Sequence, residues 1–312
     1  MHVLIPFASS HSEAASQVLQ DLALPALTEL LRRLRPTLRC DGDEATLSAP
    51  HERALAAAWS WPYVDGALPW AAHAAATDGI AVGEQAWGLL TPAHWATGSA
   101  HVTMIDPTAL ALGEAESRLL FDAIRPLFDT EGFALHWGAP LRWYASHASL
   151  AGLACASLDR VMGRNIDTWL PQSAQAPASR LLQRLQSEVQ LLLYAHPINQ
   201  LREDRHALTV NSYWLSGCGA YREQAGPHIE VLEALRAPML ANDWAAWVEA
   251  WQVLDAGPMT DLLKRSTAGE DLTLTLCGER HAQRFESQAR SLWERAASRW
   301  RSRPASGVLE AL

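Results

Sequence analysis

The sequence predicts an α/β protein in which a mixed, mainly parallel sheet is flanked by helices. Short apolar runs of strand character alternate along the chain with amphipathic stretches of helical period. No repeat is visible, and a composition of 49% hydrophobic and 19% charged residues over 312 positions is typical of globular chains. We therefore expect a single domain over residues 1–302 and a frayed tail over residues 303–312.

The first part of the chain predicts one strand and two interrupted helices. Residues 2–7 (HVLIPF) have strand character. Residues 13–35 have the spacing of an amphipathic helix, which Pro25 kinks or splits. Residues 52–77 are rich in Ala and Trp and predict a helix that two prolines break.

The middle of the chain predicts a helix with strands on both sides. Strands are expected over residues 86–90 and 101–105, and a helix over residues 114–128. Two further strands, over residues 133–137 and 141–144, are joined by Gly-Ala-Pro, which predicts a hairpin.

Residues 171–179 (PQSAQAPAS) hold two prolines and no large apolar residue, which predicts a seam between two lobes of the domain. Trp244, Trp247 and Trp251 stand at i, i+3 and i+7 and predict the buried face of one helix. The remaining expected elements are a helix over 179–195, a strand over 207–215 that ends in a glycine turn, a strand over 272–277 and a helix over 282–300.

The charge and hydropathy exclude several classes of partner. The net charge of −9 argues against a nucleic-acid partner, because such proteins neutralise phosphates with a basic surface. No apolar run reaches the roughly 18–20 residues that a membrane-spanning helix needs. The first residues lack the basic region and long apolar core of a secretory signal. We expect a cytoplasmic protein without a membrane partner, and the sequence identifies no protein partner.

Metal-binding patterns are weak. The four cysteines lie far apart, and none stands at zinc-ligand spacing, so we expect buried thiols. The nearest approach to a metal cluster is His94, His101 and Asp106 in TPAHWATGSAHVTMIDP, which helix capping and core hydrogen bonding explain equally well. No cofactor is therefore predicted.

The densest polar segment runs from residue 188 to residue 219 and suggests an anion site. In open α/β sheets, ligands gather outside the carboxyl ends of strands, and the N–H groups of a glycine turn can contact an anion. Arg202 would add a bidentate contact. The alternative is that these residues only shape a turn and an ordinary loop. The candidate ligand-binding residues are His196, Asn199, Arg202, Asn211, Trp214, Ser216, Gly217 and Gly219.

A second candidate contact lies in SLDRVMGRNIDTWLP, residues 157–171. Arg160 and Arg164 stand one helical turn apart, so both guanidinium groups can face the same way. They either clamp an anion or form surface ion pairs with Asp159 and Asp167.

The run HPINQLRED…ALTVNSYWLSGCG resembles a segment of archaeal-type cofactor-independent phosphoglycerate mutases. In that segment His-Pro-x-Asn-x-x-Arg precedes Asn-x-x-Trp-Leu-x-Gly-x-Gly. Over most of its length the chain is similar to the proteobacterial family of RpfE-type regulatory proteins, often called phosphoglycerate mutase-like. This second likeness rests on the run just quoted and on TPAHWATGSAHVTMIDP, SLDRVMGRNIDTWLP and LTLTLCGER. The resemblance implies a reduced fold of the alkaline phosphatase superfamily.

The chain departs from that superfamily at the metal ligands. Its members place Asp-Gly after the first strand to bind a metal, and use a Ser or Thr nucleophile and a late Asp/His cluster. Here the first strand runs HVLIPFASS, with Pro6 and Ala8 where an acidic ligand is expected, and His228 and His281 stand alone. The resemblance thus implies a non-catalytic or regulatory relative that binds a phosphorylated or carboxylated metabolite.

Two alternatives remain open, so the sequence does not decide whether the protein is an enzyme. An active metal-dependent phosphomutase or phosphatase would draw its divalent-metal ligands from residues such as His94, His101, Asp106 and His196. A protein-interaction scaffold would instead use exposed Trp side chains to dock a partner.

Overall fold

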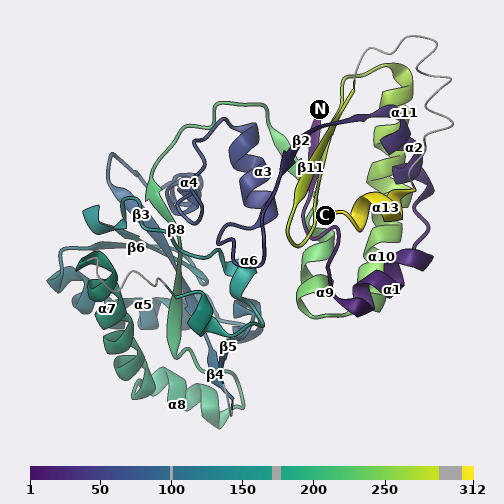
Figure 1. Ribbon diagram of the computed structural model, residues 1–312. Coiled ribbons are helices and arrows are strands. Elements are labelled where there is room, and N and C mark those ends of the chain that lie inside the picture. Colours follow the sequence, from purple (N-terminus) through teal and green to yellow (C-terminus); the bar gives the residue numbers. More distant parts are fainter. Residues whose placement is uncertain (99–100, 171–176, 288–303) are drawn as a thin grey trace. The chain divides into compact units, whose positions relative to one another are not determined.

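The computed structural model describes residues 1–98, 101–170, 177–287 and 304–312 (Figure 1). Contacts divide the chain into two compact units, each with its own sheet and hydrophobic core. Unit 1 comprises residues 1–45, 49–62 and 225–312, and unit 2 comprises residues 46–48 and 63–224.

The predicted seam lies elsewhere in the chain than these unit boundaries. Residues 171–179 fall within the range of unit 2, and residues 171–176 lie outside the described residues. The single domain and its seam therefore stay predictions.

Unit 1 is built on a mixed sheet of five strands in the order β2-β11-β10-β1-β9. The central strand β1 runs parallel to β9 and β10, whereas β11 is antiparallel to both β10 and β2. The predicted mixed α/β class is confirmed. The strands are β1 (His2–Ile5), β2 (Arg35–Cys40), β9 (Ile229–Val231), β10 (Thr273–Cys277) and β11 (Ala282–Glu286).

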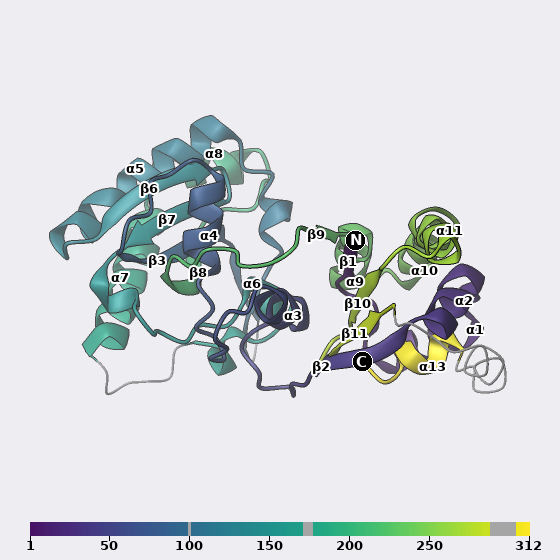
Figure 2. The same cartoon turned by 90° about the horizontal axis from the view of Figure 1, so that it is seen from above.

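Helices cover both faces of this sheet (Figure 2). On one face α1, α2, α10, α11 and α13 bury the apolar side chains of β1 and β10, and α3 lies on the other face. Trp244, Trp247 and Trp251 form the Trp stripe of α10, and the prediction that they lie on its buried face is confirmed. Trp247 and Trp251 are fully buried in this core, and Trp244 packs against it. The helices are α1 (Glu13–Asp21), α2 (Pro25–Arg33), α3 (Pro50–Ala58), α9 (Arg236–Leu240), α10 (Trp244–Leu254), α11 (Thr260–Ala268) and α13 (Ala305–Leu309).

The start of α2 is capped by a residue from the far end of the sequence. Pro25 splits the predicted helix and becomes the first residue of α2, where its missing N–H group costs nothing. Leu24 offers no side-chain cap. The buried carboxylate of Asp255, in a π-helical turn (Asp255–Met259), instead accepts from Ala26 N at 3.1 Å and from Leu27 N at 2.8 Å. A negative charge at a helix N-terminus also interacts favourably with the helix dipole.

Two predictions for the end of unit 1 are wrong. The helix expected over residues 282–300 begins instead as strand β11, because its backbone pairs with β10 on one side and β2 on the other. The remainder of that helix, from residue 288, lies outside the described residues. The tail expected to fray contains α13, because Leu309 and Leu312 are buried in the unit 1 core.

Unit 2 contains an antiparallel sheet of four strands in the order β6-β7-β3-β8. Helices α5 and α7 pack on one face with a large apolar core, and α4 packs on the other face. The predicted hairpin is confirmed as β6 and β7. The strands are β3 (Ala86–Ala93), β6 (Ala134–Ala139), β7 (Arg142–Ser146) and β8 (Ser212–Ala220), with a separate ribbon of β4 (Trp95–Thr97) and β5 (Val102–Met104).

The helices of unit 2 are α4 (Trp70–Thr77), α5 (Glu114–Thr130), α6 (Leu158–Val161), α7 (Pro177–Tyr194) and α8 (Pro197–Asp204). Three short 3-10 turns span Pro107–Leu110, Ala148–Leu150 and Ile166–Thr168, and a fourth, in unit 1, spans Glu233–Leu235. Within the described ranges no helix has both the length and the apolar character needed to cross a membrane.

The predicted glycine turn after residue 215 is wrong. Gly217 and Gly219 lie inside β8, which pairs with β3 as far as Ala220. Both glycines have positive φ, and the pairing is irregular opposite them, between Trp87 and Leu89. A Cβ on Gly217 would lie 2.8 Å from the backbone N of Ala71. The glycines therefore form a bulge that lets α4 approach the sheet.

Replacing Asp255 with Ala should lower the free energy of unfolding by about 1–3 kcal/mol, because two buried N–H groups lose their acceptor. Urea denaturation measures this loss. Asp261→Ala is the matched control, since Asp261 is exposed and pairs with Lys264 in α11; it should cost less than about 1 kcal/mol. Equal losses in the two variants would contradict the capping role.

The stability of unit 1 should fall as the pH drops from about 6.5 to about 4. Burial, together with the charge of Arg284, lowers the pKa of His2 to about 4. Its ring hydrogen-bonds Thr275 at 2.9 Å. Between the folded pKa and the ordinary value near 6.5, only the unfolded chain takes up the proton, which favours unfolding.

Thermal unfolding as a function of pH tests this dependence. His2→Gln keeps a hydrogen-bonding side chain but cannot titrate, so its melting temperature should change less over this range. The exposed His228→Gln is the control and should follow the parent protein. A His2→Gln curve parallel to that of the parent would refute the prediction.

Candidate functional site

The sequence-predicted anion contact, Arg202 of α8, lies inside unit 2 with only 1% of its surface exposed. Its Nη1 donates to Glu116 Oε2 and its Nε to the Leu208 carbonyl, each at 2.6 Å, and its Nη2 donates to the Leu110 carbonyl. Glu116 also receives a hydrogen bond from Arg205. The guanidinium is thus neutralised and hydrogen-bonded internally, and its contacts give no support to a role in binding an anion.

The neighbouring polar residues also have internal partners. The Asn199 amide donates to the carbonyls of Leu193 and Val210 at 2.8 and 2.7 Å and accepts from Val210 N at 2.9 Å. The Asn211 amide makes the corresponding pair with the backbone of Trp95, at 2.8 and 3.0 Å. These amides act as substitutes for backbone partners, which supports the alternative in which they shape the connection between α8 and β8.

The other candidates are equally engaged. His196 caps α8 by accepting from Ile198 N at 3.3 Å, and burial lowers its pKa. The Trp214 indole donates to the Ala156 carbonyl at 2.9 Å. Ser216 lies within β8 beside the two glycines.

The second predicted contact is also internal to unit 2. Arg160 donates from Nε to the Thr46 carbonyl at 2.9 Å. The guanidinium carbons of Arg160 and Arg164 lie 5.2 and 5.9 Å from the ring centroid of Trp169, within the range of a cation–π contact. The two side chains therefore do face the same way, toward an aromatic ring.

The candidate metal ligands have separate roles. His94 Nδ1 lies 2.8 Å from the Thr209 carbonyl, and Asp106 accepts from Thr108 N at 2.9 Å. His101 is exposed. In the part of the chain that the structure describes, no three His, Cys, Asp or Glu side chains gather as a metal would require. The absence of a cofactor stays a prediction.

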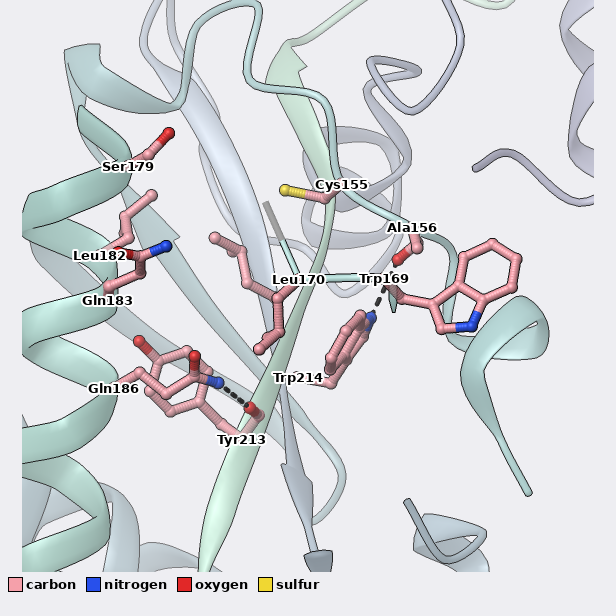
Figure 3. Close-up of a pocket in the computed structure, with 11 residues that line it drawn as sticks. Cys155, Ala156, Trp169, Leu170, Ser179, Leu182, Gln183, Gln186, Tyr213 and Trp214 are labelled. Atoms are coloured by element: carbon pink, nitrogen blue, oxygen red, sulfur yellow. Dashed lines mark hydrogen bonds between the residues drawn. The ribbon is translucent and has the colours of Figure 1, made fainter. Parts of the chain in front are cut away.

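A small cavity lies between α7 and β8 of unit 2 (Figure 3). It has a volume of about 30 Å³, and its lining includes Cys155, Ser179, Leu182, Tyr213 and Trp214. A site for one water needs about 10–15 Å³, whereas sites for small-molecule ligands occupy about 300–1,000 Å³. This cavity therefore has room for about one or two waters and is too small for a metabolite.

A different site follows from the topology of unit 1. The carboxyl ends of the parallel strands β1 and β10 lie at one edge of the sheet, where ligands gather in open α/β sheets. Just after β1, Phe7 has φ of 58°, a left-handed conformation that is rare and costly for a bulky residue. Strained residues of this kind concentrate at functional sites.

The Trp stripe of α10 holds this strained turn in place. Trp247 Nε1 donates to the Phe7 carbonyl at 3.1 Å, and Trp251 Nε1 donates to the Ala8 carbonyl at 3.3 Å. From the other side, Ala8 N donates to the Cys277 carbonyl at 2.8 Å. The backbone that carries Ser9 and Ser10 is therefore fixed by the core beneath it.

The turn from β10 to β11, residues 278–281, lies beside the end of β1. Glu279 accepts from Ser10 Oγ at 3.0 Å and from His11 N at 2.9 Å. His281 accepts from Gly42 N at 3.3 Å through Nδ1, and burial, with the charge of Arg39, lowers its pKa, which favours the neutral ring.

Arg53 of α3 contacts the same turn and is the most unusual residue of unit 1. It is 4% exposed, and its Nη2 donates to the Arg280 carbonyl at 2.5 Å. Its Nε is buried without a hydrogen-bond partner, and no carboxylate among the described residues forms an ion pair with it. Arg53 interacts electrostatically with the exposed Asp41 but forms no ion pair with it, so its buried guanidinium keeps an unused donor for an anion.

We define the strand-end cluster as residues 7–11, Arg53 and residues 278–281. Cys40 and Cys277 lie beside this cluster. Both pair in register with Ala282, so their side chains point to the same face of the sheet, the face that α3 covers. Burial raises the pKa of both thiols, so they stay protonated and are poor nucleophiles. The chemistry that the cluster offers is therefore anion binding through a guanidinium, hydroxyls and backbone N–H groups.

Sequence reasoning missed this cluster because its parts are far apart in the chain. Arg53 stands in an Ala-rich helix (ERALAAAWS) without a neighbouring polar motif. The usable signal was the polar sequence after each parallel strand: ASSHS after the first and GERH after the last.

Comparisons with known proteins give only distant likenesses. No protein-family profile and no curated protein sequence matches the chain. One similar solved structure is a cofactor-independent phosphoglycerate mutase from Thermoplasma acidophilum, with 12% identity, a TM-score of 0.39, and coverage of 93% of this chain and 90% of that one. Another is the PH0037 protein from Pyrococcus horikoshii, with 12% identity, a TM-score of 0.45, and coverage of 92% and 87%. At such values neither likeness supports an argument about the activity of this chain.

Replacing Arg202 with Met should destabilise the protein by about 3–5 kcal/mol, because Glu116 loses its buried partner. Chemical denaturation measures the loss. Arg205→Met is the control: this arginine pairs with the same carboxylate from an exposed position and should cost less than about 1 kcal/mol. A stable Arg202→Met protein would reopen the ligand-binding interpretation.

Proposed function

We propose that the protein binds a small phosphorylated or carboxylated metabolite at the strand-end cluster of unit 1, without catalysing phosphoryl transfer. The observation that carries this proposal is the buried Arg53, whose Nε has no hydrogen-bond partner and which forms no ion pair with a carboxylate of the described residues. It lies where β1 and β10 end, the edge at which α/β sheets bind ligands.

The chemistry of the cluster suits an oxyanion. A guanidinium presents a planar set of donors that matches two oxygens of a phosphate or a carboxylate. The unused Nε of Arg53 is such a donor. The hydroxyl of Ser9 lies at the same strand end, next to Gly278, where a Cβ would collide with it. These groups bind an anion by hydrogen bonds and charge and offer no activated nucleophile.

Binding without turnover is supported by the residues after the first strand. The mutases that the sequence resembles need an acidic metal ligand there, because two metal ions stabilise the transferring phosphoryl group. This chain has Pro6 and Ala8 at those positions. A regulatory role, and a place in the RpfE-type family, are part of the same proposal and are supported by the sequence resemblance alone.

Calorimetric titration with inorganic phosphate and with a three-carbon phosphorylated acid tests the proposal. The Arg53→Met variant should bind at least about tenfold more weakly, since each lost charge-assisted hydrogen bond contributes about 1.5–3 kcal/mol. Arg53→Lys keeps the charge without the planar set of donors and should be intermediate. Arg33→Met, which removes a partly exposed arginine paired with Glu29, is the control and should bind as the parent protein does.

Two results would overturn the proposal. If the Arg53→Met protein is folded by circular dichroism and binds phosphate with unchanged affinity, Arg53 does not belong to an anion site. Rapid mutase or phosphatase turnover, with stoichiometric divalent metal in the purified protein, would show that the protein is an enzyme and not only a binding protein.

A further inference from the structure

The segment over residues 304–312 ends against the strand-end cluster. Its helix α13 packs in the core of unit 1, where Leu309 and Leu312 are buried. The main-chain oxygen of Leu312 accepts from His281 N at 2.7 Å and from Arg280 N at 3.2 Å. Gly278 permits this contact, because a Cβ there would lie 2.6 Å from the Leu312 side chain.

Two adjacent backbone N–H groups that point at one oxygen form the geometry of an anion-binding nest. Arg280 and His281 present such a pair, and Leu312 supplies the oxygen. A second oxygen of the segment, that of the Ala311 carbonyl, accepts from Arg39 Nη2 at 2.9 Å. Oxygens of this segment thus occupy backbone and guanidinium donors that the oxygens of a bound phosphate or carboxylate would use.

We propose that residues 310–312 are an autoinhibitory plug that competes with the anion for these donors. Binding of the anion displaces the plug from Arg280 and His281, and the plug raises the apparent Kd by the reciprocal of the fraction of molecules in which it is unseated. This inference rests on the proposed function of the strand-end cluster. The ligand class is the same, a phosphate or carboxylate group, and the plug sets the affinity.

A variant that ends at Leu309 tests the competition. It should bind inorganic phosphate at least about tenfold more tightly than the parent protein. Leu312→Ala keeps the main chain but weakens the seating of the plug, so it should show a smaller gain in the same direction. Asp261→Ala removes an exposed negative charge from α11, outside the plug and the cluster, and is the control that should bind as the parent does. Equal affinities, within twofold, of the parent and the shortened protein would overturn the inference.

Hydrogen exchange on the unmodified protein tests the same idea without any variant that could misfold. The Leu312 amide donates to the Leu309 carbonyl at 3.1 Å, and the Glu310 amide donates to the Ser306 carbonyl at 2.8 Å. Saturating phosphate should speed exchange at both amides. Unchanged or slower exchange would overturn the plug.

The two proposals fail in different ways. If phosphate binding depends on Arg53 but leaves residues 310–312 in place, the autoinhibitory role of the plug is refuted and the proposed function stands. If phosphate binds to neither the parent nor the shortened protein, the proposed function fails, and the plug fails with it.

Discussion

Unit 1 depends on the hydrogen bonds of one four-residue turn, residues 278–281 between β10 and β11. Partners reach this turn from the start of α1, from the loop after β2, from Arg53 of α3 and from the segment that carries α13. The first three partners are more than 220 positions away in the sequence. Polar groups of a tight turn that cannot all reach water must find partners in the protein, and this requirement places the four segments together.

Two buried arginines differ in how completely their guanidinium groups are paired and hydrogen-bonded within the fold. Arg202 and Arg53 are both almost inaccessible to water. Arg202 pairs with Glu116 and is satisfied by two further carbonyls, so its role is complete within the fold. Arg53 has one carbonyl partner and a buried Nε without any. Burial alone would have ranked the two residues equally, whereas the hydrogen bonds of their guanidinium groups distinguish them.

The sequence predicted the elements that depend on local signals. Pro25, the hairpin between β6 and β7 and the Trp stripe of α10 were readable from single residues and spacing. β8 and β11 were misplaced, because their limits depend on pairing with distant strands. The glycines of β8 were read as a turn, although they mark a bulge under α4. The strand-end cluster could not be predicted for the same reason, since its members meet only through the sheet.

The position of β1 in the sheet has a consequence for synthesis on the ribosome. Both of its neighbours, β9 and β10, belong to the last third of the chain, and so does Asp255, which caps α2. Nearly all of unit 2 is contiguous in the sequence and emerges before them. Domains fold as units while the chain elongates. Unit 2 is therefore able to fold first, while the apolar amino-terminal strand and its helices still lack the strands with which they pack. A chaperone would be needed most during this interval.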